Sequence, residues 1–374
     1  MRIAINTRFL LHGQLEGIGN FIFEHFSRIT RDHPEHEFIF IFDRPYDRRY
    51  IFSPNVTAVV TGPPARHPLL WKLWFDVKIP AVLKKYKADV FVSCDGFCSL
   101  TTKVPQCLVV HDLSFLHFSS LIPKTQLLYY KYYTPRFLKT ATSIVTVSEF
   151  SSNDIIKQYH INPGKIHIVH NAARSVFREL NSDEKMKVKE KYSLGREYFL
   201  YTGSIHPRKN LITLLKAFSI FKRRQKSNWK LILAGRLAWK NNDFLKSLKT
   251  YKYREDVILT GYVEDEELAR LTGAAYALVY PSIWEGFGMP VLEAMKSNVP
   301  VITSKNSAMQ EVANDAALYF DPGSHQELSE QMMLIYKDEQ LRSKLMAAGL
   351  ERSHEFMWEK SAEKLWDAIA ICTQ

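Results

Sequence analysis

Residues 276–297 read YALVYPSIWEGFGMPVLEAMKS, and this stretch predicts a strand, a loop and a helix in that order. The apolar run YALVYP is typical of a buried strand. Pro290 suits the first position of a helix, because its missing N–H would have no partner there. Between the two elements lie two glycines, bracketed by Glu285 and Glu293. Two carboxylates beside glycines at a strand-to-helix junction indicate a function as well as a fold.

The same alternation of strand-like and helix-like runs extends along the chain in both directions. Strand-like segments are RIAIN, EFIFIF, VTAVV, ADVFVS, QCLVVH, SIVTVS, KIHIVH, YFLYTG, KLILAG, DVILTG, YALVYP and VPVITS. Runs with helical spacing separate many of them, such as NFIFEHFSRI, LITLLKAFSIFKRR and EELARLTGAA. Strand, helix and strand in this order predict parallel sheets with helices on both faces. We therefore predict an α/β fold with two doubly wound, Rossmann-like domains, since 374 residues exceed one ordinary core.

The domain boundaries follow from where strand character stops. We predict an N-terminal domain over residues 1–175, a charged linker over 176–196, a C-terminal domain over 197–355 and a terminal helix over 356–374. The terminal helix carries a wide apolar face that includes Trp358 and Trp366. That face must be buried, either against its own domain or against the first domain.

Composition limits the class of protein. The chain is 46% apolar and 24% charged, as soluble globular proteins are. No apolar run reaches the roughly 20 residues that a membrane span requires. The start of the chain enters a strand-like pattern directly, so we expect no signal peptide. Four cysteines (Cys94, Cys98, Cys107 and Cys372) fit no zinc pattern, and we expect reduced thiols in a cytoplasmic protein.

The net charge of +11 is unevenly distributed along the sequence. Residues 1–196 hold 27 Lys and Arg against 17 Asp and Glu, a net of +10. A basic half of this kind attracts anionic lipid, phosphorylated small molecules or nucleic acid, or it is simply a solvated surface. We find no recognised nucleic-acid-binding module, and we predict no nucleic-acid partner.

Polar motifs follow four strands in the C-terminal half, where parallel sheets bind their ligands. TGSIHPRKN follows YFLY, AGR follows LIL, TGYVEDEE follows VIL, and WEGFGMP follows ALVYPS. The main chain of Gly286, Phe287, Gly288 and Met289, together with the helix N-terminus, predicts an anion site. Carboxylates suit such a site only if the ligand also offers hydroxyls. A diphosphate with sugars on both sides satisfies every group, although Glu293 could instead complement the helix dipole, worth roughly 0.3–1 kcal/mol.

The segment EGFGMPVLEAMKSNVPVITS closely resembles the Glu-x7-Glu segment of the retaining nucleotide-sugar glycosyltransferases called family 4, or group 1. TGSIHPRKNLITLLKAF resembles their Gly-x5-Lys loop, and LTGYVEDEELARL resembles their nucleobase-side segment. GIGNFIFEHF, VVHDLSFLHF and TVSEFSSNDI also match in the first half, so the resemblance covers nearly the whole chain. It implies a GT-B architecture, in which two Rossmann-like domains face each other across a cleft and the terminal helix crosses back to the first.

The resemblance also implies roles for the C-terminal residues. Glu285 would contact donor-sugar hydroxyls and Glu293 the ribose hydroxyls, while the main chain of residues 286–289 would meet the sugar and phosphates. Lys209 matches the lysine that binds the diphosphate. Ser204 stands where many members have arginine, and Arg208 is the expected compensation.

Further donor contacts are implied at other strand ends. The main chain of Val263 would read the nucleobase edge, while Tyr262 beside it is equally compatible with packing. Gly235 matches a strand-end glycine of the family. In the first half, Gly17, Ile18 and Gly19 would let the diphosphate approach a helix start, or they make a tight helix entry. His111 ends a predicted strand, and the family places its equivalent beside the donor sugar.

Together these observations predict a retaining, metal-independent glycosyltransferase of the hexosyltransferase class. It would move a hexose-type sugar from a nucleotide-diphosphate sugar, with no other cofactor, to a glycan or lipid-linked acceptor in cell-surface polysaccharide or lipopolysaccharide biosynthesis. The alternatives are a nucleotide-sugar epimerase of the same fold and a non-catalytic nucleotide-sugar-binding protein. Residues 71–87 and 127–141 mix aromatics with lysines. This suits a packed helix or, with the basic first half, peripheral contact with an anionic membrane at its inner face, and the tyrosines of 127–141 would also suit an acceptor platform.

Overall fold

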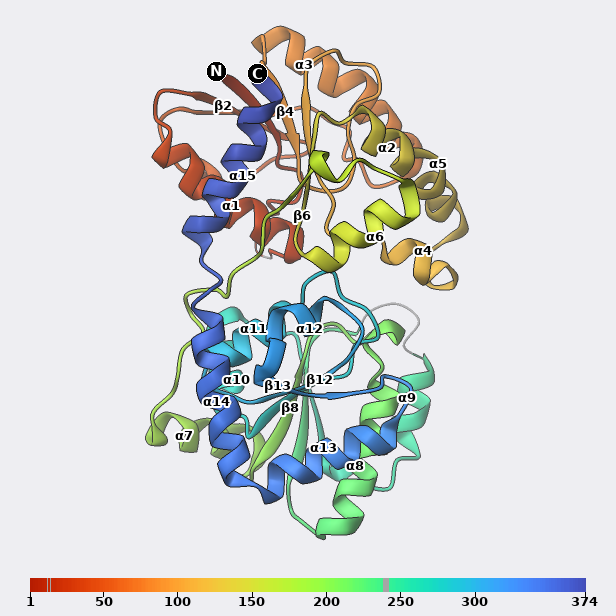
Figure 1. The fold of residues 1–374 in the computed structure, drawn as a ribbon, viewed down its shortest axis with the longest axis vertical. Helices are drawn as coiled ribbons and strands as arrows, with labels where there is room; N and C mark the ends of the chain where they lie inside the picture. Colours follow the sequence, from red (N-terminus) through yellow and green to blue (C-terminus); the bar gives the residue numbers. More distant parts are fainter. Residues whose placement is uncertain (12, 14, 238–241) are drawn as a thin grey trace. The chain divides into compact units, whose positions relative to one another are not determined.

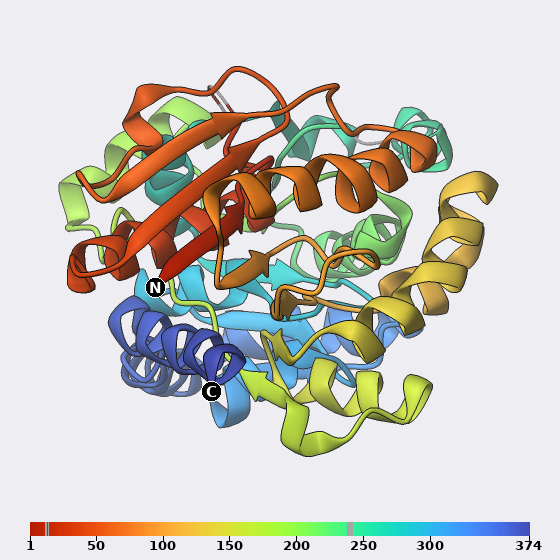
Figure 2. The same ribbon diagram turned by 90° about the horizontal axis from the view of Figure 1, so that it is seen from above.

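The computed structural model describes residues 1–11, 13, 15–237 and 242–374, and these fold as two compact units (Figure 1). The N-terminal unit comprises Met1–Asn171 together with Met357–Gln374. The C-terminal unit comprises Ala172–Phe356. The division at Asn171 lies close to the boundary expected at residue 175. Both chain ends belong to the N-terminal unit (Figure 2).

The N-terminal unit is built on a seven-stranded parallel sheet in the order β3-β2-β1-β4-β5-β6-β7. Its strands are β1 (Arg2–Asn6), β2 (Glu37–Phe42), β3 (Val56–Val60), β4 (Val90–Ser93), β5 (Gln106–Val109), β6 (Ser143–Thr146) and β7 (Ile166–Ile168). Its helices are α1 (Gly17–Asp32), α2 (Pro68–Leu73), α3 (Ile79–Tyr86), α4 (Ser114–His117), α5 (Lys124–Thr140), α6 (Glu149–Tyr159) and α15 (Trp358–Ala370). Each strand falls on a predicted segment.

The aromatic and lysine-rich run of residues 71–87 lies largely in the core of this unit. It forms the end of α2, a π-helical turn over Trp74–Lys78 and then α3. Trp74 and Phe75 are buried in one cluster with residues from the sheet and from α5. Leu73 and Val77 nevertheless stay exposed. The packed-helix interpretation therefore accounts for one side of this segment only.

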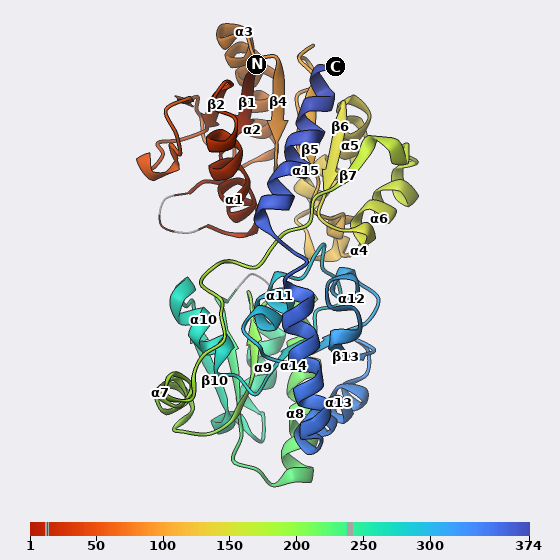
Figure 3. The ribbon, with the colours of Figure 1, turned by 60° about the vertical axis from the view of Figure 1, so that its left-hand side comes forward.

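The C-terminal helix α15 packs against α1 in the N-terminal unit (Figure 3). Trp358 meets the ring of His25 edge-on at 5.4 Å, and Ser361 Oγ lies 2.8 Å from His25 Nε2. The apolar face of this helix is thus buried against the first unit. The helix begins at Trp358 rather than at 356, and Phe356 stays in the C-terminal unit, where its ring lies 5.7 Å from that of Phe287.

The C-terminal unit is built on a six-stranded parallel sheet in the order β10-β9-β8-β11-β12-β13. Its strands are β8 (Tyr198–Thr202), β9 (Lys230–Ala234), β10 (Val257–Gly261), β11 (Ala277–Tyr280), β12 (Val301–Ser304) and β13 (Ala317–Phe320). Its helices are α7 (Ser182–Ser193), α8 (Leu211–Gln225), α9 (Asn242–Lys249), α10 (Asp265–Gly273), α11 (Met289–Lys296), α12 (Ala308–Ala313), α13 (His325–Lys337) and α14 (Glu339–Ser353). Strand β13 is absent from the predicted set.

The segment predicted as a charged linker, residues 176–196, contains helix α7 (Ser182–Ser193). Asn181 and Glu184 make a capping box that satisfies the first backbone N–H groups of the helix. Tyr192 then donates to Glu267 on α10 at 2.7 Å, so α7 packs on the C-terminal unit. The many charged residues of this segment and its lack of strand-like runs indicated a linker. The same composition is equally typical of a helix that lies on the surface of a domain.

This boundary changes how the charge is shared. The N-terminal unit holds 22 Lys and Arg against 16 Asp and Glu, and the C-terminal unit holds 28 against 23. The net charges of the two units are therefore +6 and +5. The excess of the first half of the sequence arises partly because residues 172–196, with a net charge of +3, belong to the C-terminal unit. Charge by itself no longer singles out the N-terminal unit as the membrane-facing one.

Each sheet contains one point at which the strand order reverses. In the C-terminal unit this point lies between β8 and β11, and in the N-terminal unit between β1 and β4. Loops at the carboxyl ends of such a strand pair diverge, and ligands of doubly wound folds bind there. No described helix combines the length and the apolar character needed to cross a bilayer.

Candidate functional site

Lys209, Arg208 and Glu285 meet at the reversal point of the C-terminal sheet. Lys209 and Arg208 lie in a short 3₁₀ turn after β8, and Glu285 lies in the loop after β11. Lys209 Nζ pairs with Glu285 Oε1, and Arg208 Nη1 lies 3.3 Å from Oε2 of the same carboxylate. Both cations are therefore held by Glu285, although 76 residues separate Lys209 from it. Arg208 lies where it can compensate for Ser204.

Two hydroxyl groups that the sequence analysis missed complete this cluster. Tyr280, the last residue of β11, accepts a hydrogen bond from Lys209 Nζ at 2.8 Å and donates to Glu285 Oε1 at 3.1 Å. Ser282 Oγ also donates to Glu285 Oε1. The ring of Tyr280 stacks on that of Tyr201 at 5.9 Å. A tyrosine that ends a buried strand beside a polar loop was the available signal, because its hydroxyl must find a partner there.

The charge of Glu285 is set by its neighbours. Burial raises its pKa, but Lys209 and Arg208 outweigh that effect and lower the pKa to about 2. Glu285 is therefore a carboxylate at neutral pH, with both oxygens accepting hydrogen bonds or ion pairs. Burial, followed by the charge of Glu285, raises the pKa of Tyr280 well above its usual range, so its hydroxyl stays protonated. In this arrangement Glu285 can accept hydrogen bonds from the hydroxyl groups of a ligand, and Lys209 and Arg208 can pair with an anion of the ligand instead of with Glu285.

The glycine loop turns sharply into α11. Gly288 has φ of 113°, and a Cβ there would lie 2.9 Å from Met309 Cγ. The helix begins at Met289, which makes Pro290 its second residue rather than its first, because Gly288 provides the cap. The Phe287 side chain is buried against Phe356, and Gly286 is buried beside it. The predicted contacts of this loop's main chain with the sugar and phosphates stay a prediction.

Glu293 lies deeper than a residue that merely complements the helix dipole. It is 4% exposed and lies beyond the first turn of α11, because the helix begins at Met289. Arg174 Nε donates to Glu293 Oε1 at 2.7 Å, and Arg174 Nη1 lies 2.5 Å from Asp265 at the start of α10. Neither residue was predicted: Arg174 belongs to a segment that carries no motif, and Asp265 lies in the TGYVEDEE segment but was not singled out. One carboxylate oxygen of Glu293 is thereby fixed in position.

The pKa of Glu293 depends on this pair. Burial raises its pKa above the ordinary value, and the Arg174 guanidinium opposes that rise. Burial lowers the pKa of Arg174, and Glu293 and Asp265 more than reverse this, so the guanidinium stays charged. Arg174 is thus the group that keeps Glu293 available as an acceptor of hydrogen bonds.

Close backbone packing explains the glycine at the end of β9. A Cβ on Gly235 would lie 2.0 Å from the carbonyl oxygen of Gly203, which follows β8. Gly203 N–H donates to Ala234 O at 2.9 Å, and Tyr201 donates its hydroxyl hydrogen to Ser204 O at 2.9 Å. Gly235 and Ser204 therefore help to shape the loop that carries Lys209.

Tyr262 and Val263 occupy the turn between β10 and α10. Tyr262 is 48% exposed, so packing does not account for it. The same turn leads to Asp265, which contacts Arg174. Arg174 therefore connects the turn with the predicted nucleobase contact to Glu293, the predicted ribose contact.

In the N-terminal unit the predicted residues lie at helix and strand ends. Gly17 and Ile18 open α1, and a Cβ on Gly17 would meet nothing within 4 Å. A Cβ on Gly19 would lie 2.6 Å from Phe9 O, so a tight helix entry explains this glycine. His111 follows β5 and donates through Nε2 to Cys94 O at 3.0 Å. Burial lowers the pKa of His111, which is therefore a neutral imidazole at pH 7.

The reversal point of the N-terminal sheet carries a charged pair that the sequence analysis did not single out. Arg8, after β1, lies 2.5 Å from Asp95, after β4, and both side chains are almost fully buried. Asn6 donates to the same carboxylate at 2.7 Å. The pair braces the two loops that diverge at this point.

Comparison with known proteins agrees with this architecture. The family described as "Glycosyl transferases group 1" matches residues 182–372, and "Glycosyltransferase Family 4" matches residues 17–174. The O-antigen chain mannosyltransferase B of Escherichia coli is 35% identical over 263 residues, which cover 70% of this chain and 69% of that protein. The O-antigen chain mannosyltransferase RfbU of Salmonella typhimurium is 30% identical over 274 residues, covering 72% and 71%.

The fold also agrees with a solved structure. The crystal structure of Anabaena HepE in complex with UDP-glucose superimposes with a TM-score of 0.74 at 17% identity, covering 99% of both chains. The predicted α/β fold is confirmed, and it is of the GT-B type. The chain therefore belongs to the group 1 glycosyltransferases.

Proposed function

We propose that this glycosyltransferase is a retaining, metal-independent mannosyltransferase that uses a nucleotide-diphosphate sugar to build a cell-surface polysaccharide. The observation that carries the proposal is the cluster of Lys209, Arg208 and Glu285 at the reversal point between β8 and β11. The choice of mannose is supported by the two O-antigen mannosyltransferases that are 30% and 35% identical to the chain.

Donor binding exchanges partners within this cluster. A diphosphate carries more negative charge than a carboxylate, so it draws Lys209 and Arg208 away from Glu285. Glu285 stays ionised because its pKa is about 2, and its freed oxygens accept hydrogen bonds from donor-sugar hydroxyls. Glu293, fixed by Arg174, accepts from the ribose hydroxyls. The main chain at Gly288 and Met289 meets the phosphates at the start of α11.

The same cations stabilise the transition state. Cleavage of the bond between the anomeric carbon and the phosphate oxygen leaves charge on the nucleoside diphosphate, which the two cations offset without a metal ion. The carboxylate of Glu285 is bound by Lys209 and Ser282. This arrangement suits a carboxylate that accepts hydrogen bonds from sugar hydroxyls better than one that acts as a covalent nucleophile. We therefore propose that the acceptor attacks on the face from which the phosphate departs, assisted by that phosphate.

The acceptor is a growing glycan, free or lipid-linked. This assignment rests on the O-antigen chains named for the two relatives. His111 contributes a neutral imidazole at a strand end of the N-terminal unit, where most of the acceptor would bind. Its second ring nitrogen can accept a hydrogen bond from a sugar hydroxyl.

A panel of nucleotide sugars tests the proposal. GDP-mannose, UDP-glucose, UDP-galactose and UDP-N-acetylglucosamine are each supplied with and without a mannoside acceptor, in buffer with EDTA. We expect transfer from the mannose donor alone, with the anomeric configuration retained in the product by NMR. Glu285→Ala should abolish transfer and weaken nucleotide binding only modestly, because the cations that hold the diphosphate remain.

Other outcomes would contradict particular parts of the proposal. Transfer by Glu285→Ala at the rate of the unaltered enzyme would remove the role of that carboxylate. A changed donor sugar in the absence of acceptor would favour an epimerase. Tight donor binding without any turnover would favour a non-catalytic binding protein. Inhibition of transfer by EDTA would contradict the proposal that the enzyme needs no metal ion.

We also propose that the N-terminal unit contacts an anionic membrane through α2 and α5. Large apolar side chains are exposed on these helices and on the π-helical turn, and we call them the α2–α5 patch: Leu69, Leu73, Val77, Leu128 and Tyr132. The two helices lie side by side, since Lys72 Nζ of α2 is 5.4 Å from the ring centroid of Tyr133 of α5 (Figure 1). Exposed cations lie among these residues at Lys72, Lys131 and Arg136. Apolar side chains flanked by cations suit the headgroup region of an anionic bilayer.

Co-sedimentation with vesicles tests the α2–α5 patch. We expect binding to vesicles that contain phosphatidylglycerol, weaker binding in high salt, and little binding to pure phosphatidylcholine. Burying one leucine contributes roughly 1.5 kcal/mol or more, so Leu69→Ser with Leu128→Ser should lower binding at least about tenfold. Val60→Ser, an exposed change on β3, is the matched control. Equal losses in the control and the double variant would refute the assignment.

A further inference from the structure

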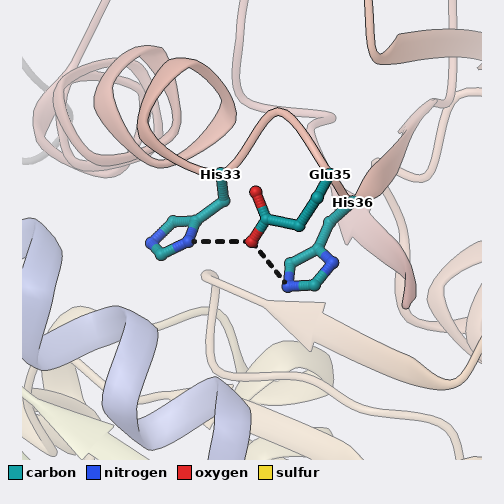
Figure 4. A group of neighbouring side chains, drawn as sticks. All are labelled: His33, Glu35 and His36. Carbon is teal, nitrogen blue, oxygen red and sulfur yellow. Dashed lines mark ion pairs between the residues drawn. The ribbon is translucent and has the colours of Figure 1, made fainter.

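The turn between α1 and β2 brings three metal-ligand side chains together, His33, Glu35 and His36 (Figure 4). His33 Nδ1 lies 3.6 Å from Glu35 Oε1, and His36 Nε2 lies 3.3 Å from the same oxygen. One ligand atom from each residue falls within 4.8 Å of the other two. Zinc bonds of about 2.0–2.2 Å at tetrahedral angles place neighbouring ligand atoms roughly 3.3 Å apart. The side chains are therefore close to the spacing that one ion requires.

The backbone of this turn is held in place from a third segment. The Asn55 side-chain amide donates to the carbonyl oxygens of Thr30, His33 and His36 at 2.9, 3.2 and 3.1 Å. One side chain thereby joins the end of α1 to the start of β2. Because the turn is already ordered, an ion that binds there does not have to order it.

Both imidazole rings are also oriented. The ring of His33 stacks on the indole of Trp366 with centroids 3.7 Å apart and planes 18° apart. His36 Nδ1 lies 3.2 Å from the Met1 nitrogen, which leaves its Nε2 towards Glu35. The stacking on Trp366 and the contact with Met1 restrain the orientations of the two rings. Glu35, whose side chain is 59% exposed, stays free to adjust.

The turn lies far from the residues proposed to act in transfer within the same unit. It precedes β2 and is therefore at the amino ends of the parallel strands, whereas His111 follows β5 at the carboxyl ends. An ion at the turn would not reach His111. It would instead restrain His33, on which Trp366 of α15 is stacked, and so stabilise the packing of the C-terminal helix.

We propose that His33, Glu35 and His36 form a binding site for one divalent transition-metal ion of the zinc class, which fastens the α1–β2 turn beneath α15. Two imidazoles and one carboxylate suit Zn²⁺, Ni²⁺ or Cu²⁺, whereas Ca²⁺ and Mg²⁺ prefer oxygen ligands throughout. The exposed side of Glu35 leaves room for water as a further ligand. The site serves stability and is independent of the proposed sugar transfer.

Calorimetry with Zn²⁺ on the full chain, free of any affinity tag, tests the site. We expect one ion per folded chain at neutral pH, and Mg²⁺ should not compete. His33→Ala and His36→Ala should each lower the affinity at least about tenfold, since loss of even an outer contact costs that much. Glu35→Gln removes the charge at an exposed position without disturbing the fold, and it should also weaken binding. His354→Ala, an exposed histidine outside the cluster, is the matched control and should bind as the unaltered chain does.

Two further readouts connect the ion to the fold. At a free Zn²⁺ concentration about 100-fold above its Kd, Tm of the unaltered chain should rise by roughly 5–10 °C, and that of Glu35→Gln should rise less. Ni²⁺ should quench tryptophan fluorescence in the unaltered chain, and Trp366→Phe should lose most of that quenching. The four cysteines are buried and do not compete for these ions in the folded chain.

The proposal is overturned if Glu35→Gln and His36→Ala bind Zn²⁺ as tightly as the unaltered chain. It is also overturned if His354→Ala loses as much affinity as the cluster variants, because the ion would then bind elsewhere.

Discussion

Arg174 and Glu293 show how one buried contact determines whether a predicted residue can act. Glu293 was predicted from its spacing to Glu285, but its environment makes a charge costly, and burial raises its pKa. Arg174 offsets that cost from 2.7 Å and is itself held by Asp265. The arginine therefore positions the carboxylate and keeps it ionised. Its position in the sequence, among residues that lack any motif, hides this role.

Replacing Arg174 with glutamine should move the acid limit of nucleotide binding to higher pH. The pKa of Glu293, already raised by burial, rises further without the guanidinium, so the carboxyl takes up a proton closer to neutral pH. Binding of the nucleoside diphosphate, measured by calorimetry across pH, should then fall at a higher pH than in the unaltered chain. A pH profile that does not move would contradict this positioning role.

The same change has a stability signature. Breaking a buried ion pair from one side costs about 3–5 kcal/mol. The pKa of Glu293 is higher in the folded state than in the unfolded state, so at pH values between these two pKa values the folded state binds more protons than the unfolded state. The free energy of unfolding therefore falls as pH rises through the folded pKa. Urea denaturation of Arg174→Gln at several pH values should show this slope. Arg178→Gln, whose partner Glu184 lies on the surface and has its pKa lowered to about 2, should affect the slope only in the acid range and should leave nucleotide binding unchanged.

At the scale of elements, the entry into α11 depends on a backbone conformation. Gly288 lies in the left-handed region at φ of 113°, and its α-hydrogen faces Met309 at a distance that leaves no room for a methyl group. The turn lies between the carboxyl end of β11 and the start of α11. The predicted anion site is therefore a property of this turn as much as of the helix.

Gly288→Ala should destabilise the chain and weaken donor binding together. A side chain in the left-handed region costs roughly 1–2 kcal/mol, and contact with Met309 adds to that cost. Relief of this strain requires the start of α11 to move, so nucleotide affinity should fall beyond what partial unfolding explains. Thermal denaturation and calorimetry on the folded fraction measure the two effects.

Gly195→Ala is the matched control, because Gly195 also has positive φ, at 73°, but it lies at the end of α7 against a flexible glutamate. It should lose stability and keep nucleotide affinity. Equal affinity losses in the two variants would remove the special role of Gly288.

Element types were predictable where the pattern is local. Buried parallel strands read as short apolar runs, and the predicted segments became β1 to β12. β13 was missed, although ALYF has Asn314 and Asp315 before it and Asp321 to Gly323 after it, which are typical turn residues. The segment around α7 was misassigned. Whether a charged run is a linker or a helix lying on a surface depends on a partner, here Glu267 on α10, that is distant in sequence.

At the scale of the whole molecule, the crossing of α15 redistributes both mass and charge. Its apolar face predicted burial, the family resemblance implied a crossing back to the first domain, and the structure packs it on α1 in the first unit. The crossing moves a net charge of −1 to the first unit, and residues 172–196, with a net charge of +3, belong to the second. The units therefore carry similar net charges, and the membrane proposal depends on the local α2–α5 patch. The same crossing creates the contact of Trp366 with His33, on which the metal proposal depends in part.

The sequence alone determined the class of the fold, the loop of Glu285 to Glu293 and the presence of Lys209 at a strand end, because hydrophobic periodicity and glycine chemistry are local properties of the chain. Only the tertiary structure decided which charges meet. The pairing of Lys209 with Glu285, the clamp of Arg174 on Glu293 and the hydroxyl of Tyr280 between two charged groups arise where separate strands end side by side. Electrostatic energy depends on distance and burial, and neither is set by spacing along the chain.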